Sequence, residues 1–489
     1  MSSPISRRRL LGHSALAGIA LAAPLSRLMA QQGFAPGRLG NSAYGPLQPA
    51  VDRTTGLPLL RLPEGFRYSS FGWTGDGMSD GAPTPARHDG MAIVAEDNRG
   101  FAVLVRNHEL SIDALLGNEH TPVYDDFSLP GLLPGLAGGT TTTWLRNGRR
   151  LGDYGSLAGT VANCAGGPTP WGSWLSCEEA IVMGNVIGAR DHGYVFEVPA
   201  LARASAVPIV DMGLMAHEAV AVDPDDGAVY LTEDNGNTSG FYRFLPHDPS
   251  PRVGALEAGG YLQMLRVVGV DNANLAEVAA GDQYNVAWVP IDDPNAPPDS
   301  LVAVAPGFPP TNGAGRSGPY RQGEALGGAR FNRGEGCWYA HGVVYFVDTS
   351  GGPAGKGAVW AYQPAKSLLT AIYVSPADTE ADNVDNVTVS PRGGLLLCED
   401  GGGHTPAGAA FRGTRLIGVD QRGVAFEFAE NNILLEASLP DRPAIPLQDY
   451  RSSEFAGACF DRFGRTLYVN IQTPGVSFAI RGPWWRGAL

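Results

Sequence analysis

Short apolar runs that end on polar residues recur along the chain. Gly, Pro, Asn and Asp separate these runs, and helical spacing of apolar residues is scarce. This pattern is typical of short β-strands joined by turns. Six runs resemble one another, and they end on Glu109, Glu178-Glu179, Glu233-Asp234, Asp348, Glu399-Asp400 and Gln472.

A shorter apolar run with a polar opening residue precedes each of the six. The openings are His88-Asp89, Cys164, His217-Glu218, Glu335, Asp385 and Glu454. Six degenerate copies of one unit predict an all-β fold, a six-bladed β-propeller. Because the inner strands of a propeller line its channel, the openings and the acidic ends should meet at one face. Extra length in 110–150 and 235–330 predicts loop insertions that cover that face. Strands ending on acids also occur in other sheet proteins, so that alternative stays open.

The first 30 residues have the pattern of an export signal. Three arginines, Arg7 to Arg9, precede an apolar run from Ala15 to Ala23 that is too short to span a bilayer, and Leu28-Met29-Ala30 offers a small-residue cleavage site. We expect residues 1–30 to be a twin-arginine signal peptide read by that export machinery, which predicts a periplasmic or secreted protein. The alternative is a basic N-terminal tail.

The remaining chain divides into two expected segments. Residues 31–65 are rich in Gly and Pro and predict an irregular N-terminal arm, whereas 66–489 predict a single propeller domain. The sequence leaves the oligomeric state open, and we take a monomer as the working expectation.

Charge narrows the range of partners. The net charge is −14, and removal of residues 1–30 would take away four arginines and no acid, leaving −18. Such a chain is a poor partner for nucleic acid, whose phosphates require basic patches, but it suits cations. Lys356 and Lys366 are the two lysines in the sequence. We therefore expect arginine to be the residue that binds anions, since its planar guanidinium can donate two hydrogen bonds to a phosphate.

The segment from Asn163 to Glu179 joins a thiol to a pair of carboxylates. Successive strand residues point to opposite sides, so Glu178 and Glu179 cannot face the same way, and one of them can join Cys164. A thiolate with a carboxylate is a donor set for metal ions. The alternative is a buried structural cysteine beside a surface pair of acids.

Several carboxylates that converge on one channel repel each other unless cations are bound. We expect such convergence from five residues, Glu109, Glu179, Glu218, Glu335 and Asp400. Calcium suits the oxygen-rich part, and Cys164 favours a redox-capable or softer ion such as ferric iron. Zinc is less favoured, because the chain has no CxxC spacing and no HExxH motif.

Arg333 stands two residues before Glu335. Strand alternation places both side chains on one side, so Arg333 could reach an anion bound beside the metals. An arginine beside several metals is the arrangement that phosphoryl transfer requires. The alternative is a structural counter-ion for the carboxylates.

At these residues the sequence resembles the PhoX-type alkaline phosphatases, which use the twin-arginine route. The segments that carry the resemblance are RNHEL, GGTTTTWL, NCAGGPTPWGSWLSCEE, AHEAVAVDPDDGAVYLTEDN with FYRF, RGEGCW, DNVTVSPRGGLLLCEDGGG and EFAGACFDRFGRTLYVNIQTPG. The resemblance implies a six-bladed propeller that holds two ferric irons and calcium ions and hydrolyses phosphomonoesters.

The family's site residues are carried over by position. The resemblance implies that Cys164 is the iron-ligating cysteine and that Glu179, Glu218, Glu335, Asp400 and Glu109 are metal ligands. It also implies that Arg333 is catalytic and binds substrate, and that Asn107 contacts substrate.

The leading hypothesis is therefore an exported phosphatase that uses Fe³⁺ and Ca²⁺ to hydrolyse small phosphomonoesters. One alternative is a calcium-dependent propeller hydrolase of another kind, such as a lactonase or a phosphotriesterase. Another is a binding propeller without catalytic activity, in which calcium is structural.

Overall fold

A computed structural model describes residues 37–489 except 130, 132, 185–187, 304–309, 312–314 and 440. The twin-arginine signal expected in residues 1–30 lies outside the described residues. Among those described, no helix has both the length and the apolar character needed to cross a bilayer.

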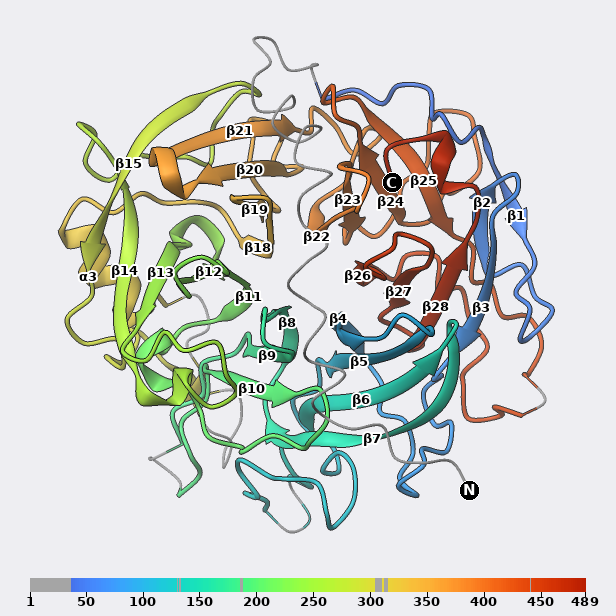
Figure 1. Ribbon diagram of the computed structural model, residues 1–489, viewed down its shortest axis with the longest axis horizontal. Coiled ribbons are helices and arrows are strands. Elements are labelled where there is room, and N and C mark those ends of the chain that lie inside the picture. The colour runs from blue at the N-terminus through green and yellow to red at the C-terminus, as the bar shows by residue number, and fades with distance from the viewer. Residues whose placement is uncertain are drawn as a thin grey trace.

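The strands radiate from a central axis, which gives an all-β, propeller-like fold (Figure 1). Six strands surround the axis, and each lies beside the next in a closed ring. The ring strands are β4 (His88–Glu96), β8 (Asn163–Pro168), β11 (His217–Val222), β18 (Gly334–Ala340), β22 (Val384–Val389) and β26 (Phe455–Phe460).

Each ring strand pairs antiparallel with the strand that follows it in the chain, and further strands extend outward. The second strands are β5 (Phe101–His108), β9 (Ser173–Glu178), β12 (Val229–Glu233), β19 (Val343–Asp348), β23 (Leu395–Glu399) and β27 (Leu467–Ile471). The outer strands are β6 (Gly138–Arg146), β7 (Arg149–Thr160), β10 (Val195–Pro199), β13 (Phe241–Pro246), β14 (Gly260–Val267), β15 (Gln283–Pro290), β20 (Ala358–Gln363), β21 (Leu368–Val374), β24 (Arg415–Val419), β25 (Ala425–Asn431) and β28 (Val476–Arg481).

The hydrogen-bonded sheets do not divide into six equal four-stranded blades. The β15–β21 pairing joins the strands after β11 and after β18 into one nine-stranded sheet, and the sheet from β8 to β10 has three strands. A two-stranded sheet, β16 (Val302–Ala303) with β17 (Pro310–Thr311), lies apart from these. The described residues include one α-helix, α3 (Gly318–Ala325). Short 3₁₀ helices span Val210–Met212, Gly236–Thr238, Leu256–Ala258, Pro364–Lys366 and Trp484–Arg486.

The expectation of an irregular arm over 31–65 is wrong for its second half. Strands β1 (Leu47–Ala50) and β2 (Leu60–Pro63) pair with each other, and β2 adds to the sheet edge at β25. Leu60 and Leu62 of β2 are buried in the core, so this segment covers the sheet edge. Strand β3 (Arg67–Phe71) then pairs with β28, so the N-terminal side of the chain completes the last sheet.

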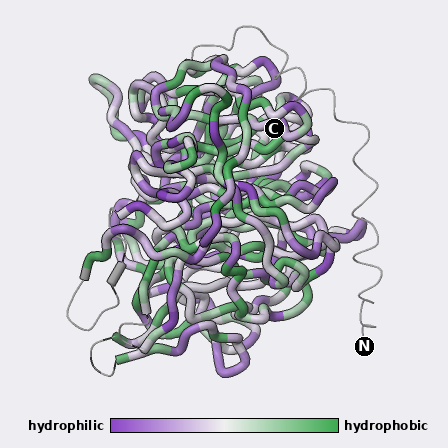
Figure 2. The backbone as a smooth tube through the Cα atoms, turned by 90° about the vertical axis from the view of Figure 1, so that its left-hand side faces the viewer, coloured by the Kyte–Doolittle hydropathy of each residue, from purple (hydrophilic) through white to green (hydrophobic). Residues whose placement is uncertain are grey.

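The apolar core lies between neighbouring sheets. Buried hydrophobic residues form seven separate clusters in the described chain. Accordingly, hydrophobic segments, coloured green in Figure 2, occur throughout the molecule. All five cysteines are buried and unpaired. Cys177, Cys337, Cys398 and Cys459 each belong to one of the apolar clusters and are small core residues.

The described residues of the two expected insertions do not line the cavity on the ring axis. Strands β6 and β13 to β15 lie within 110–150 and 235–330 and extend the sheets outward. A loop segment, 448–454, contributes to the lining of that cavity.

Candidate metal centre

All six ring hairpins contain the same irregularity near the axis. In each, the ring strand advances three residues while its partner advances two, which is a β-bulge. The shifts lie between His88 and Met91, Asn163 and Gly166, His217 and Val220, Gly334 and Cys337, Val384 and Val387, and Ala456 and Cys459.

The first bulged residue is an acid or a cysteine in five of the six hairpins. These residues are Asp89, Cys164, Glu218, Glu335 and Asp385, and all five line one cavity of about 430 Å³. A bulge re-aims a side chain out of the regular strand alternation. The repeated bulge is therefore what turns these side chains into the axial cavity.

Glycines let the ring strands approach closely enough for the cavity to form. A Cβ on Gly90 would lie 2.5 Å from the Cα of Ala165 in the next ring strand, and one on Gly336 would lie 2.7 Å from the Cα of Asn386. Real Cβ atoms do not approach other atoms this closely, so a side chain at either position would push the strands apart. The glycine after the polar opening thus helps bring donors from different sheets together.

The residue that follows the second strand supplies the other donors. Glu109, Glu179 and Asp400 each come directly after such a strand, and all three line the cavity. The acids one position earlier point elsewhere. Glu178 accepts hydrogen bonds from His192 Nδ1 at 2.7 Å and from three backbone N–H groups, and Glu399 pairs with Arg415 at 2.7 Å. The structure therefore separates the two acids of each pair as strand alternation predicts.

Nine side chains, eight carboxylates and one thiol, form four overlapping clusters. Within each cluster the donor atoms lie within 4.8 Å of one another. The clusters are Cys164 with Glu179 and Glu218; Asp89 with Glu109 and Glu454; Glu218 with Glu335 and Asp385; and Asp385 with Asp400 and Glu454. The first combines thiol and carboxylate, while the other three offer oxygen alone, so the donor sets fit a softer or redox ion beside hard cations.

Burial and mutual repulsion act on these groups together. Burial first, and then Glu218, Glu179 and Asp89, raise the pKa of the Cys164 thiol well above its ordinary value. Burial likewise raises the pKa values of Glu179, Glu218, Glu335 and Glu454, with the neighbouring carboxylates adding to it. Burial and Asp400 raise the pKa of Asp385 to about 7. A set of acids held this close requires protons or multivalent cations.

Arg333 lies at the cavity and contacts two acids. Its Nη2 donates to Glu335 Oε1 at 2.8 Å and to Asp234 Oδ2 at 2.9 Å, and its Nε donates to Asp234 Oδ1 at 3.1 Å. Burial opposes its charge, yet Glu335 and Asp234 raise the pKa of Arg333. Its backbone has a φ of 65°, which is uncommon for a residue other than glycine. The guanidinium is therefore held charged and in place at the cavity wall.

A second arginine lies at the same cavity. Arg87 donates from Nη1 to Gln472 Oε1 at 2.6 Å, and Gln472 donates from Nε2 to Glu109 Oε2 at 2.5 Å. Its side chain is half exposed, and its φ is 51°. Arg87 and Arg333 therefore both combine a cationic head at the cavity with a left-handed backbone, a combination found at functional sites.

The structure does not bring Asn107 to the cavity, which corrects the expected substrate contact. Asn107 is fully buried, and its Nδ2 donates to the backbone carbonyls of Cys164 at 3.1 Å and Ala165 at 2.6 Å. Its Oδ1 accepts from Trp174 Nε1 at 2.8 Å and Ser176 Oγ at 2.9 Å. With its amide engaged in this way, Asn107 positions the segment that carries Cys164.

The expected ligands Cys164, Glu179, Glu218, Glu335, Asp400 and Glu109 all meet in the cavity, together with Arg333. Sequence reasoning did not assign Asp89, Asp385 and Glu454 as ligands, although it identified each as a strand opening. It also missed Arg87 and Asp234. For Asp89 and Asp385 the signal was available, since each holds the position in the repeat that Cys164 and Glu218 hold in theirs. Glu454 lies three residues before that position, which Gly457 holds in its hairpin.

Fold and cavity together define a class of protein, an all-β propeller-like ring with an anionic cavity on its axis. The chain belongs to the family described as alkaline phosphatase PhoX, whose model matches residues 42–150 and 129–475. A search of curated proteins finds no match.

Solved structures with a partly similar fold have low sequence identity to this protein. A gluconolactonase from Xanthomonas campestris is 11% identical, with a TM-score of 0.38 over 92% of this chain and 99% of that one. The PQQ domain of a pyranose dehydrogenase from Coprinopsis cinerea is 11% identical, with a TM-score of 0.30 over 86% and 97%. The Dos1 propeller is 9% identical, with a TM-score of 0.32 over 89% and 95%. TM-scores this low carry no argument about function.

Proposed function

We propose that this protein is an exported phosphatase that hydrolyses phosphomonoesters in the axial cavity, with Fe³⁺ and Ca²⁺ held by its acidic side chains. The observation that carries the proposal is the meeting of eight carboxylates and one thiol beside Arg333. Membership of the PhoX alkaline phosphatase family supports it.

The donor chemistry divides the cavity into two parts. Cys164, Glu179 and Glu218 would hold iron, because this cluster is the one that contains a thiol. The all-oxygen clusters around Asp89, Asp385 and Glu454 would hold calcium. When bound, such cations supply charge neutralisation and Lewis-acid polarisation of a phosphate.

Arg333 would bind the phosphate of the substrate. Its Nε and Nη2 are engaged by Asp234 and Glu335, while its Nη1 makes no hydrogen bond within the described part of the chain. A guanidinium fixed in this way can donate to a phosphate oxygen and stabilise the negative charge that develops during transfer. Arg87, half exposed at the same cavity, would guide the anionic substrate inward.

Further parts of the proposal concern architecture and location. The closed ring of six strands supports a six-bladed count, with the nine-stranded sheet taken as two blades joined at β15 and β21. Export by the twin-arginine route to the periplasm or beyond rests on residues 1–30. The net charge of −14 argues against nucleic-acid partners, and a monomer stays the working expectation.

Elemental analysis and phosphatase assays of natively exported protein test the proposal. We expect iron and calcium, and turnover of p-nitrophenyl phosphate at alkaline pH. Cys164→Ala should lose iron, and Arg333→Ala should lose turnover while keeping its metals. Arg316→Ala is the matched control, since Arg316 also pairs with two acids, Asp299 and Glu324, and is similarly exposed.

Each alternative function has its own outcome. Calcium without iron, together with hydrolysis of lactones or phosphotriesters, would favour another propeller hydrolase. Calcium that stabilises the fold, with no turnover of any of these substrates, would favour a binding propeller. Unchanged p-nitrophenyl phosphate turnover in both Cys164→Ala and Arg333→Ala would place the active site elsewhere.

A further inference from the structure

A second cavity, here called the rim cavity, lies on the outer edge of the ring. Its volume is about 780 Å³, and β3, the start of β7 and the end of β28 line it. These are outer strands of two neighbouring sheets, at the periphery of the ring in Figure 1. The rim cavity shares no lining residue with the axial cavity. It is therefore a separate feature of the surface.

The lining of the rim cavity is strongly basic in a chain whose net charge is −14. It contains six arginines and a single acid, Asp76. Two of the arginines are neutralised, since Arg442 pairs with Asp76 at 2.7 Å and Arg150 pairs with Asp153 at 2.6 Å. The other four have no ion pair within 4.0 Å in the described part of the chain, and they are Arg53, Arg67, Arg149 and Arg481.

Two of these arginines face each other across a strand pair. Arg67 of β3 is directly opposite Arg481 of β28 in the antiparallel register. Like charges at opposed positions destabilise a sheet, because the side chains lie within a few ångströms of each other. The described chain offers no carboxylate that pairs with either guanidinium. A bound anion would remove this repulsion.

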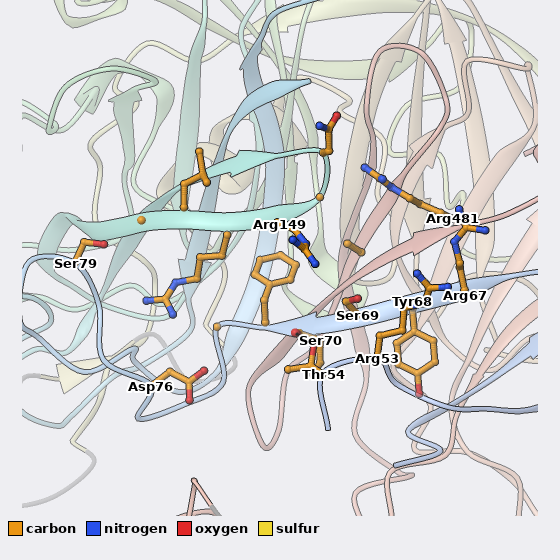
Figure 3. Close-up of a pocket in the computed structure, with 18 of the residues that line it drawn as sticks. Arg53, Thr54, Arg67, Tyr68, Ser69, Ser70, Asp76, Ser79, Arg149 and Arg481 are labelled. Atoms are coloured by element: carbon orange, nitrogen blue, oxygen red, sulfur yellow. Dashed lines mark hydrogen bonds between the residues drawn. The ribbon is translucent and has the colours of Figure 1, made fainter. Parts of the chain in front are cut away.

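The local structure holds Arg481 at the cavity wall. Its Nε donates to Thr466 Oγ1 at 2.9 Å. Its Nη2 lies against the turn between β6 and β7, where a Cβ on Gly148 would be 3.1 Å away. Gly148 has a φ of 72°, so glycine suits both the turn and the close approach of the guanidinium. The same turn leads into Arg149, and Figure 3 shows Arg149, Arg67, Arg53 and Arg481 gathered around the cavity.

We propose that the rim cavity is a binding site for a small anion that carries at least two phosphate groups. The positive charge of four unpaired guanidiniums is more than one monoanion can balance. A guanidinium can also donate two hydrogen bonds to the oxygens of one phosphate group. Ser69, Thr54 and Asn147 add polar groups to the lining. The volume lies within the range of roughly 300–1,000 Å³ that small-molecule sites occupy.

Binding of inorganic tripolyphosphate, followed by calorimetry, tests the site. We expect the wild-type protein to show a binding event that weakens by at least about tenfold in the Arg67→Gln/Arg481→Gln double variant, since charge-assisted contacts are lost. Any tripolyphosphate that binds in the axial cavity is common to both proteins and cancels in the comparison. Arg252→Gln is the control, because Arg252 is exposed and lies outside both cavities.

Thermal unfolding provides a second measurement that does not depend on the phosphatase reaction. Without ligand, Arg67→Gln should keep or raise the melting temperature, since it removes the like-charge pair. Tripolyphosphate should raise the melting temperature of the wild-type protein more than that of the double variant. Turnover of p-nitrophenyl phosphate should be unchanged in the double variant. The proposal of an anion site in the rim cavity can therefore be rejected without affecting the proposal of phosphatase activity in the axial cavity, and the reverse also holds.

Comparison ligands identify what the site recognises. Equal affinity for ATP and tripolyphosphate would assign recognition to the phosphate chain alone, and tighter binding of ATP would add a nucleoside contact; both support the site. Citrate binding as tight as tripolyphosphate would overturn the assignment to phosphate. Tripolyphosphate affinity that is equal in wild type and the double variant would overturn the site itself.

Discussion

The Nη2 of Arg333 lies 2.9 Å from Oδ2 of Asp234, and a second contact joins Nε to Oδ1 at 3.1 Å. Asp234 follows β12, whereas Arg333 precedes β18, so the pair links two neighbouring hairpins of the ring. A two-point contact fixes the plane of a guanidinium as well as its position. Asp234 is therefore a positioning residue for the group that we expect to meet the phosphate.

Replacement of Asp234 by asparagine should release Arg333. Because a hydrogen bond between charged groups contributes on the order of 1.5–3 kcal/mol, we expect kcat/KM for p-nitrophenyl phosphate to fall by about tenfold or more. Iron and calcium contents should stay at the wild-type level, since Asp234 belongs to none of the four donor clusters. Loss of metal in Asp234→Asn would instead make Asp234 part of the metal site.

Glu178 and Glu179 should respond differently to the same substitution. Glu179 lines the axial cavity, so Glu179→Gln should lower metal content while the metal-free stability is kept or raised. Glu178 accepts hydrogen bonds from His192 and from the backbone of Val161, Gly193 and Tyr194. Glu178→Gln should therefore lower the free energy of unfolding by about 3 kcal/mol, because the charged partner of a buried pair is removed. Metal analysis and denaturant unfolding of both variants check this contrast.

His192 should make the free energy of unfolding depend on pH between about 6.5 and 9. Burial alone would lower the pKa of His192, but Glu178 and Asp125 raise it from 6.5 to about 9. A raised pKa means that the folded state binds the proton more tightly. The resulting stabilisation is fully present below pH 6.5 and is lost as pH rises toward about 9. Its size is on the order of 3 kcal/mol.

Unfolding free energies at pH 6 and pH 9.5 measure this contribution when wild type is compared with His192→Gln. The difference between the two proteins should shrink as pH rises. A difference that stays constant across this range would show that His192 does not change its protonation.

The sequence predicted much of the site because the ligands repeat with the strands. Side chains alternate between the two faces along β9 and β23, which separates Glu179 from Glu178 and Asp400 from Glu399. This alternation can be predicted from the sequence alone. The repeated strand openings likewise placed Cys164, Glu218 and Glu335 at one face.

Other parts depend on features that a sequence does not display. A β-bulge turns Asp89 and Asp385 into the cavity, and the sequence does not show the bulge itself, so their place in the repeat was the one sign of their role. Asn107 lies in β5, two residues before Glu109, and the family resemblance implied a substrate contact for it, yet its amide is engaged by the backbone of the segment that carries Cys164. The β1–β2 pair in the expected arm was hidden by its Gly and Pro content.

Replacement of Asn107 by alanine tests its revised role. The carbonyls of Cys164 and Ala165 would lose their donor, so the segment that carries the thiol should shift. We expect iron content to fall, while the KM of the molecules that retain metal stays within about twofold, because Asn107 does not line the cavity. Asn118→Ala, which removes an amide bonded to the carbonyl of Asp80, is a control away from the axis. A raised KM with full iron content would restore the substrate contact.

Chelation should expose the repulsion that bound cations would offset. Removal of metal leaves Glu218 within 4.8 Å of donors in two clusters, and burial together with Asp385, Glu179 and Asp89 opposes its ionisation. EDTA should therefore lower the melting temperature of the wild-type protein at neutral pH. Glu218→Gln removes one of the crowded charges, so the metal-free variant should melt about 2 °C or more above metal-free wild type.

With metal bound, the Glu218→Gln variant should melt below the wild-type protein, because the variant lacks a ligand that two clusters share. Melting curves of the two proteins, each with and without EDTA, give the four values that are needed. A metal-free Glu218→Gln protein that melts below metal-free wild type would show that hydrogen bonding, not charge repulsion, governs the axial cavity.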